Sequence, residues 1–265
     1  MEDSKQQLLQ ILERDRLQNA LLIRALNVTP NAKAYIYGES IAVREAEGGI
    51  WLFALNRKGD FAELIKMIGS ELSYTFLLND ADYFEDVHHV LPHSVGVRYL
   101  QYAIDRPAYS ETVYEPAEGI ELVPMDHSWM EYILSVYESQ EFANEDYVGK
   151  CLDCNPAYGA LYHGEKVGFI MCHLDGEVGT IVVSEKAQGK GLGRLLMQAI
   201  TPDYIAKGGI GSGMVLPENT ICNRMLRGSY YTATPKHVMW AYIEINDTPE
   251  DVKEKADHIE EGTEE

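Results

Sequence analysis

Residues 181–194 read IVVSEKAQGKGLGR, an apolar strand-like run that leads into three glycines at alternate positions. Apolar residues at helical spacing follow over residues 192–206, so the glycines open a helix. Glycines let backbone N–H groups turn toward one point, and a helix start adds unpaired N–H groups and the positive dipole end. Lys186, Lys190 and Arg194 add three cations. The segment therefore predicts a bound phosphate or pyrophosphate.

Two common phosphate-binding motifs do not fit this segment. The dinucleotide fingerprint G-x-G-x-x-G requires its third glycine at a different interval. The P-loop requires Lys and then Ser or Thr after its last glycine, whereas Gly193 is followed by Arg194 and Leu195.

Strand-like and helical segments alternate in two cycles, which predicts two domains and an α/β (α+β) fold with a mixed sheet. The first cycle, in residues 1–118, has expected helices at 5–26, 60–68 and 81–89 and expected strands at 33–37, 40–45, 50–55, 74–78 and 95–104. The second cycle, in residues 119–245, has expected strands at 120–123, 158–163, 214–216, 230–234 and 238–245, a hairpin of 166–173 with 177–184, and helices from residues 126, 144, 192 and 218. An acidic tail, residues 246–265, follows.

The composition narrows the class of partner. A net charge of −20 disfavours binding to nucleic acid and to anionic membranes, and it makes a local anion site conspicuous. No apolar stretch is long enough to span a membrane, and the polar N-terminus does not resemble a signal peptide. We therefore expect a cytoplasmic protein, and a homodimer is compatible with the sequence. Cys151 and Cys154 have C-x-x-C spacing, which fits either structural cysteines or a metal or redox site; we expect no metal.

The string Q-x-x-G-x-G at residues 188–193, followed by Arg194, resembles the coenzyme A (CoA) pyrophosphate motif of the GNAT acyltransferases. Asn219 lies on a later helix, where that superfamily carries an asparagine. The resemblance implies a GNAT fold with a splayed central sheet and acetyl-CoA, or another acyl-CoA, as co-substrate. The residues it implies for CoA binding are Val182, Val183, Gln188, Gly189, Lys190, Gly191, Leu192, Gly193, Arg194 and Asn219. Asn223, one helical turn after Asn219, is a further candidate for CoA binding, and the alternative is that it only faces solvent.

A narrower resemblance covers the whole chain. Residues 30–38, PNAKAYIYG, and the stretch from Glu218 to Tyr231 are similar to glycine N-acyltransferase-like proteins. Those proteins have a degenerate GNAT-like half before the catalytic half. The resemblance implies the same organisation here, with residues 1–118 as the degenerate domain.

Glu177 is the candidate general base. It begins the strand that leads to Val183, and several GNAT branches carry a glutamate there. Because residues two apart on a strand share a face, we expect Glu177, Gly179, Ile181 and Val183 to line up, with the Glu177 carboxylate directed along the acyl-binding groove. The alternative is a solvent-exposed glutamate at the edge of the hairpin.

The general acid is open. The family often carries a tyrosine where this chain has Leu226, so Tyr230 or Tyr231 could replace it, or the thiolate could leave to water. His163 and His173, near strand ends, fit either packing or catalysis.

We therefore expect an N-acyltransferase that transfers an acetyl or other short acyl group from CoA to a primary amine of a small molecule, such as an amino acid. Two alternatives stay open: a weakly active acyl-CoA sensor, and an acetyltransferase for a polyamine or protein lysine. A carboxylate on the acceptor would require a cation such as Arg224 or Arg227, whereas the acidic chain suits a cationic acceptor.

Overall fold

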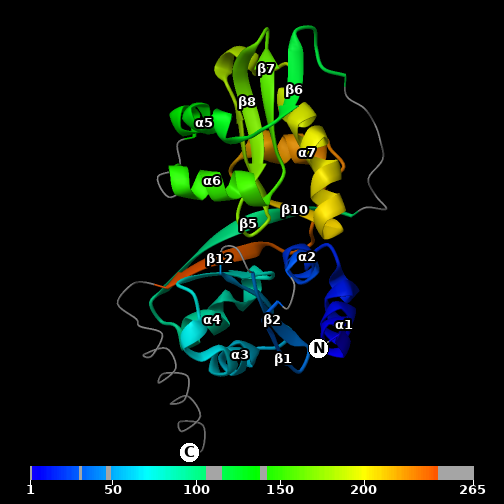
Figure 1. Ribbon diagram of the computed structural model, residues 1–265. Coiled ribbons are helices and arrows are strands. Elements are labelled where there is room, and N and C mark those ends of the chain that lie inside the picture. The colour runs from blue at the N-terminus through cyan, green and yellow to red at the C-terminus, as the bar shows by residue number, and fades with distance from the viewer. Residues whose placement is uncertain (1, 30–31, 46–48, 106–114, 138–141, 244–265) are drawn as a thin grey trace, which may run out of the picture. The chain divides into compact units, whose positions relative to one another are not determined.

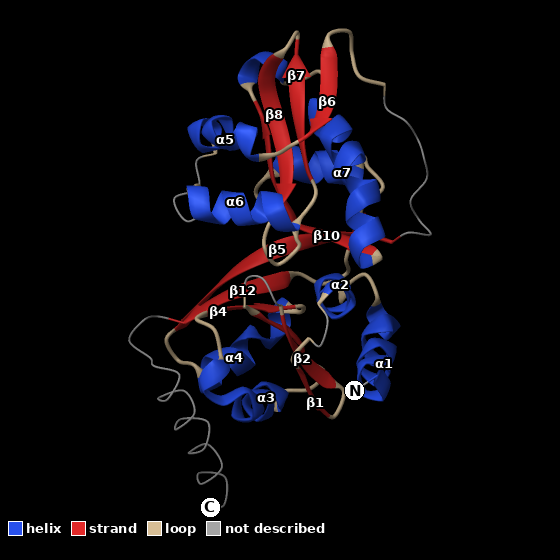
Figure 2. Ribbon diagram, in the orientation of Figure 1, coloured by secondary structure: helices blue, strands red, loops and turns tan. Residues whose placement is uncertain are grey.

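The computed structural model describes residues 2–29, 32–45, 49–105, 115–137 and 142–243 (Figures 1 and 2). The chain divides into two compact units, which we describe separately. Unit 1 contains the residues up to Gln101, Val215–Glu218 and the described residues from Ala233; unit 2 contains Tyr102–Met214 and Asn219–Thr232. Within the described residues, none of the helices combines the length and apolar character needed to cross a membrane.

Unit 1 is a mixed sheet covered by helices. Its helices are α1 (Glu2–Leu12), α2 (Ala20–Val28), α3 (Asp60–Ile68) and α4 (Phe84–Val90). Its strands are β1 (Ala34–Tyr37), β2 (Ser40–Arg44), β3 (Trp51–Ala54), β4 (Thr75–Leu78), β12 (Val238–Ile243) and most of β5 (Ser94–Asp105), in the order β1-β2-β3-β4-β12-β5. β3 and β4 are parallel, and the other pairs are antiparallel.

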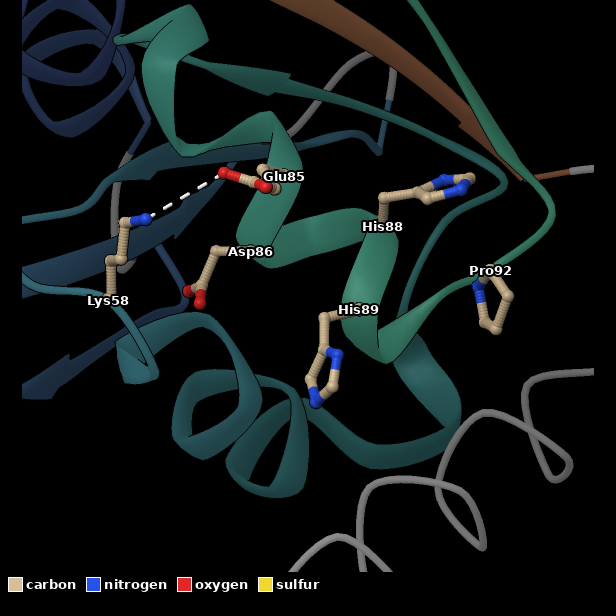
Figure 3. A pocket seen from close by; sticks show the side chains of 6 residues that line it. All are labelled: Lys58, Glu85, Asp86, His88, His89 and Pro92. Carbon is tan, nitrogen blue, oxygen red and sulfur yellow. Dashed lines mark ion pairs between the residues drawn. The ribbon is translucent and has the colours of Figure 1, made fainter.

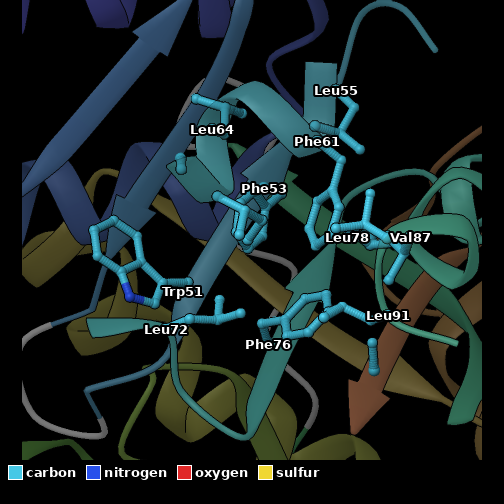
Figure 4. Close-up of a cluster of buried hydrophobic side chains, with 14 of the residues drawn as sticks. Trp51, Phe53, Leu55, Phe61, Leu64, Leu72, Phe76, Leu78, Val87 and Leu91 are labelled. Carbon is cyan, nitrogen blue, oxygen red and sulfur yellow. The ribbon is translucent and has the colours of Figure 1, made fainter. Parts of the chain in front are cut away.

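Both faces of the sheet are buried at β3 and β4. Phe53 and Phe76 pack with Phe61 of α3 and Val87 of α4 in one core (Figure 4). Leu52 and Leu77 are cross-strand partners on the opposite face, and they are also buried. On that side α2 contacts β2 and β3. A strand that is buried on both faces reads as a continuous apolar run, as residues 51–55 do.

The predicted helix over residues 5–26 is two helices. Side chains between them bond to backbone carbonyls instead of continuing the helix: Asn19 Nδ2 donates to Leu12 O at 2.9 Å, and Gln18 Nε2 donates to Asn79 O at 2.5 Å. α2 is buried nearly throughout, so its apolar pattern is that of a core helix.

Unit 2 has a second sheet between two helical layers. Its strands β6 (Ile120–Pro124), β7 (Ala157–Tyr162), β8 (Glu165–Cys172) and β9 (Val178–Val183) form an antiparallel sheet in that order. Two further strands, β10 (Ile210–Val215) and the short β11 (Thr232–Ala233), pair with β5 in the first sheet. Its helices are α5 (Met130–Val136), α6 (Glu145–Cys154), α7 (Leu192–Gly208) and α8 (Thr220–Arg227). α5 and α6 pack over Phe169 and Met171, and α7 contacts β7, β8 and β9.

The predicted hairpin of 166–173 with 177–184 is present as β8 and β9, with Gly176 at φ +80 in the turn. The last strand differs from the predicted grouping of residues 119–245. β12 lies between β4 and β5 of unit 1, where Trp240 is paired with both Leu77 and Val97.

A polar network holds the segment before β12 in unit 1. Lys236 Nζ donates to Asp80 Oδ2 at 2.6 Å, and Lys236 N donates to Gln18 Oε1 at 3.1 Å. Thr234 N donates to Gln101 O at 2.9 Å. Because these partners come from three separate parts of the chain, unit 1 requires the C-terminal strand to complete its sheet.

This arrangement predicts that a chain ending after Thr232 loses the fold of unit 1. The truncation removes Met239, Ala241 and Ile243 from the core and leaves β4 and β5 with open edges. Burial of each large apolar side chain contributes about 1.5–3 kcal/mol, so the loss approaches the total stability of a small domain. Hydrogen exchange should be fast in β4 and β5 of this chain and slow in a control chain ending after Ile243. Equal protection would contradict the prediction.

Candidate functional site

The glycine segment forms the N-terminus of α7. Gly189 and Gly191 have φ of +74 and +77, in the left-handed region that favours glycine, and Gly191 is the N-cap of α7. Among the described residues, the N–H groups of Gly189, Lys190 and Gly191 donate to no backbone carbonyl. The helix start and the loop therefore provide exposed donors for an anion, as the sequence predicts for residues 188–194.

The three cations of this segment have different surroundings. Lys186 Nζ forms an ion pair with Glu165 Oε2 at 2.5 Å. Lys190 Nζ lies 4.2 Å from the centroid of the Tyr162 ring, a cation–π contact, and none of the described acidic residues forms an ion pair with it. Arg194 lies against the glycine after α8: a Cβ on Gly228 would come within 2.9 Å of Arg194 Nη2. Lys190 and Arg194 are thus the cations best placed to attract an anion.

The sheet is split between β9 and β10, as the predicted splay requires. β9 is an edge strand of its sheet, whereas β10 follows β5 in the other. The two strands approach each other at one end, where a Cβ on Gly213 would lie 2.7 Å from Val178 O. In the described residues, no ladder joins β9 to β10. The backbone of β9 beyond Val178 therefore has one side open.

Strand geometry decides which amides face this open side. Ser184 N donates to Val167 O at 2.8 Å, and alternate residues of a strand direct their N–H groups to the same side. Val182 therefore directs its N–H toward β8, and a Cβ on Gly168 would meet Val182 O at 2.7 Å. Val183 and Ile181 direct theirs to the open side. Of the predicted pair, Val183 fits the role of a free amide, and Ile181 was not predicted.

A β-bulge at Thr180 changes the faces of β9. Met171 pairs with Gly179 and Ile170 with Ile181, so Thr180 is the extra residue, and its φ is +31. The expectation that Glu177, Gly179, Ile181 and Val183 share one face is wrong. The bulge places Ile181 and Val183 on the α7 side, where Ile181 Cδ1 lies 3.8 Å from the position of a Cβ on Gly193. Gly179 and Val182 lie on the α5 and α6 side, since Val182 packs against that core.

Glu177 is buried, with 7% of its surface exposed, so it is not a solvated hairpin-edge residue. Its Oε1 accepts a hydrogen bond from Met214 N of β10 at 2.5 Å. Burial, with a smaller contribution from the Asp175 charge, holds the pKa of Glu177 well above its ordinary value, although the Met214 N–H opposes this shift. A carboxylate with a raised pKa is a stronger proton acceptor than an exposed glutamate.

Asn219 and Asn223 have roles within the chain. Asn219 is the N-cap of α8, and its Oδ1 accepts from Cys222 N at 3.0 Å. Asn223 is buried; its Oδ1 accepts from Tyr102 OH at 3.0 Å, and its Nδ2 donates to Asn219 O at 2.9 Å. The side chain of Asn223 therefore stabilises α8, which the helical spacing from Asn219 could not reveal.

The candidate acids differ in exposure. Leu226 is buried, as is Tyr231, whose OH lies 3.4 Å from Thr201 Oγ1; Tyr230 is half-buried.

Cys151 packs in the core with Trp129 and Phe169, and burial raises the pKa of its thiol to about 12. Across the described ranges, no three His, Cys, Asp or Glu side chains are grouped to hold a metal ion.

The Acetyltransferase (GNAT) family matches residues 122–227, which include the hairpin, the open edge of β9 and the glycine segment. These residues form a GNAT acetyltransferase domain. No curated protein matches the chain significantly in sequence.

Solved structures extend the likeness beyond that domain. A Drosophila protein matches with a TM-score of 0.63 at 13% identity, over 91% of this chain and 88% of its own. A GCN5-related N-acetyltransferase from Kribbella flavida matches with a TM-score of 0.54 at 14% identity, over 85% of this chain and 95% of its own. A conserved protein of unknown function from Staphylococcus epidermidis matches with a TM-score of 0.51 at 13% identity, over 82% and 96%. Because the Kribbella match exceeds residues 122–227, the N-terminal half also has a GNAT-like fold.

The N-terminal GNAT-like half has the same strand-helix-strand order, but its corresponding elements are closed. β3 and β4, joined by α3, form a parallel ladder, whereas β9 and β10 are split. At the N-terminus of α3, Gly59 N donates to both carboxylate oxygens of Asp86 at 2.9 Å. Lys58 pairs with Glu85 at 3.7 Å in the same surface hollow (Figure 3). The chain's own carboxylates thus occupy the place that an anion would take.

The anion site of residues 188–194 predicts that Lys190→Ala and Arg194→Ala each weaken CoA binding roughly tenfold, the scale of one charge-assisted hydrogen bond. Lys186→Ala is the matched control, because Lys186 is already paired with Glu165 and should change the Kd less than about threefold. Calorimetry with CoA measures all three. An effect of Lys186→Ala as large as the others would contradict the assignment of the anion site.

Closure of the N-terminal half predicts one CoA per chain. Calorimetric titration of the wild type should give a single binding event, and the double variant Lys190→Ala, Arg194→Ala should weaken that event without revealing a second one. A second, independent CoA site in that variant would show that Asp86 does not block the N-terminal half.

Proposed function

We propose that this chain is an N-acyltransferase that transfers an acetyl or other short acyl group from CoA to a primary amine of a small molecule, such as an amino acid. One observation carries the proposal: the continuous segment 177–194 places a buried carboxylate, an open strand edge and an anion cradle in sequence. An acyl-CoA requires these three features in the same order, for the attacking amine, the thioester and the pyrophosphate.

Glu177 acts as the general base in this proposal. An amine attacks a thioester only after losing its extra proton, and an acceptor with a pKa near the working pH is the most effective. The raised pKa of Glu177 supports this role. Its second carboxylate oxygen, which does not take the Met214 N–H, is the one that would accept the proton, directly or through one water.

The open amides of Ile181 and Val183 stabilise the oxyanion that forms when the amine attacks. Backbone N–H groups fixed in a strand need no reorganisation during the reaction, which is why such donors are effective. When the C–N bond has formed, the C–S bond breaks and the thiolate takes up a proton. Tyr230, half-buried after α8, is a better candidate donor than the buried Tyr231, and water can replace either.

The acidic character of the chain favours a cationic acceptor over long range, so polyamines and peptide lysines belong in the test panel beside amino acids. We propose a cytoplasmic location, which the four free cysteines support because they fit a reducing compartment. The deciding assay is release of CoA thiol across acyl-CoAs and amines. Amine-dependent release supports the proposal, whereas acyl-CoA binding without release from any amine would favour a sensor.

The role of Glu177 predicts separate effects for two substitutions. Glu177→Gln keeps an acceptor for Met214 N but cannot take a proton, so turnover should fall about 10²–10⁴-fold with little change in acyl-CoA Kd. Glu177→Ala should lower both turnover and Tm, because it also leaves the Met214 N–H without its partner.

Glu185→Gln is the matched control, since Glu185 is exposed on the same segment and should change neither quantity. The Gln defect should shrink at high pH, where more of the amine is neutral. A Glu177→Gln variant with wild-type kcat at neutral pH would leave Glu177 with the structural role alone.

A further inference from the structure

Thr180 occupies a backbone conformation that its residue type disfavours. Among the described residues, the non-glycine residues with positive φ are His163 and Thr180. A β-branched side chain is strained in the left-handed region, where glycine or asparagine is usual. Strain of this kind persists where the surrounding structure enforces it, and it is concentrated at functional sites. Glycine would relieve this strain, so the presence of threonine at position 180 requires a role for its side chain.

The hydroxyl of Thr180 is the centre of a hydrogen-bonded chain. Thr180 Oγ1 donates to Tyr137 OH at 3.1 Å, and His173 Nε2 lies 3.4 Å from the same oxygen. Tyr147 OH lies 2.8 Å from His173 Nδ1. With the Thr180 proton donated to Tyr137, the arrangement fits a neutral His173 that donates from Nε2 and accepts at Nδ1.

Several contacts hold the imidazole of His173 in this place. A Cβ on Gly179 would come within 2.2 Å of His173 Cδ2, so glycine at this position makes room for the ring. Asn155 Nδ2 donates to His173 O, and His173 N donates to Glu177 O, both at 2.9 Å. Burial raises the pKa of Tyr147, which keeps its hydroxyl a proton donor. His173 thus has a fixed orientation and is more than a turn residue.

We propose that Thr180 is a positioning residue for acyl transfer: its hydroxyl, held between Tyr137 and His173, fixes the bulge so that the next amide, that of Ile181, points to the open edge of β9. The inference rests on the proposed function. It adds three residues to the site: Tyr137 at the C-terminal end of α5, Tyr147 of α6 and His173 after β8. In a regular strand Gly179 and Ile181 would point the same way, and the bulge reverses this relation. The hydrogen bonds of Thr180 connect the bulge to the side chains of Tyr137, His173 and Tyr147, which lie outside the glycine motif of residues 188–193.

Two nearly isosteric variants separate the hydroxyl from the shape of the side chain. Thr180→Val keeps the branched shape and the strain but cannot form the hydrogen bonds, and its kcat should fall about 10–100-fold, as expected for a small misplacement of a reacting group. Thr180→Ser keeps the hydroxyl and should stay within about threefold of the wild type. Acyl-CoA Kd should change less than about threefold in both. Tyr137→Phe removes only the partner of Thr180 and should lower kcat in the same direction.

The Ile181 amide gives a readout that does not need turnover. Addition of acetyl-CoA without amine should shift the Ile181 ¹H–¹⁵N resonance of the wild type and Thr180→Ser relative to CoA alone, and this shift should be lost in Thr180→Val. Acetyl-CoA binding with this shift but without turnover on any amine would contradict the proposed function and leave the positioning inference supported. Wild-type kcat and an unchanged Ile181 shift in Thr180→Val would overturn the inference.

Discussion

The site depends on one strand edge that the fold leaves open. Backbone N–H and C=O groups that are removed from water need partners, and among the described strands β9 is paired with β8 alone. The carboxylate of Glu177 satisfies Met214 N at the point where β10 approaches, and beyond that point the two strands belong to different sheets. The same side chain therefore terminates the contact between the strands and stands at the start of the opening. A ligand that supplies acceptors to the free amides completes the hydrogen bonding of this edge.

Because β12 belongs to unit 1, the chain has to return from unit 2 to unit 1 to complete the sheet of unit 1. β12 is the last of the described strands along the chain, but it lies inside the sheet of unit 1, between β4 and β5. The sheet is thus built from pairings between segments far apart in sequence, which makes its formation slow compared with local structure. The side chain of Gln18 and the carbonyl of Gln101 specify where the returning chain enters, because they accept hydrogen bonds from Lys236 N and Thr234 N.

Electrostatics distinguishes the two GNAT-like halves. In a chain of net charge −20, an anion site has to be built from local groups, and the N-terminus of α7 combines free backbone N–H groups with Lys190 and Arg194. The N-terminus of α3 offers a similar start, but Asp86 satisfies Gly59 N there. The helix start in one half therefore keeps backbone N–H groups that bond to no described backbone carbonyl, whereas in the other half a carboxylate of the chain accepts from the corresponding N–H group.

The sequence alone determined the two-part GNAT-like fold, the hairpin before the glycines and the glycine turn that begins α7. These are local patterns: strand alternation, a tight turn, and glycines with cations at a helix start within residues 177–194. It did not determine the bulge at Thr180, which sets the face of Glu177 relative to Ile181, or the choice between the amides of Val182 and Val183. It also did not place β12 beside β4, or Asp86 at Gly59. Each of these depends on partners far along the chain or on a single residue's φ, and neither leaves a periodic signal; only the tertiary structure decides them.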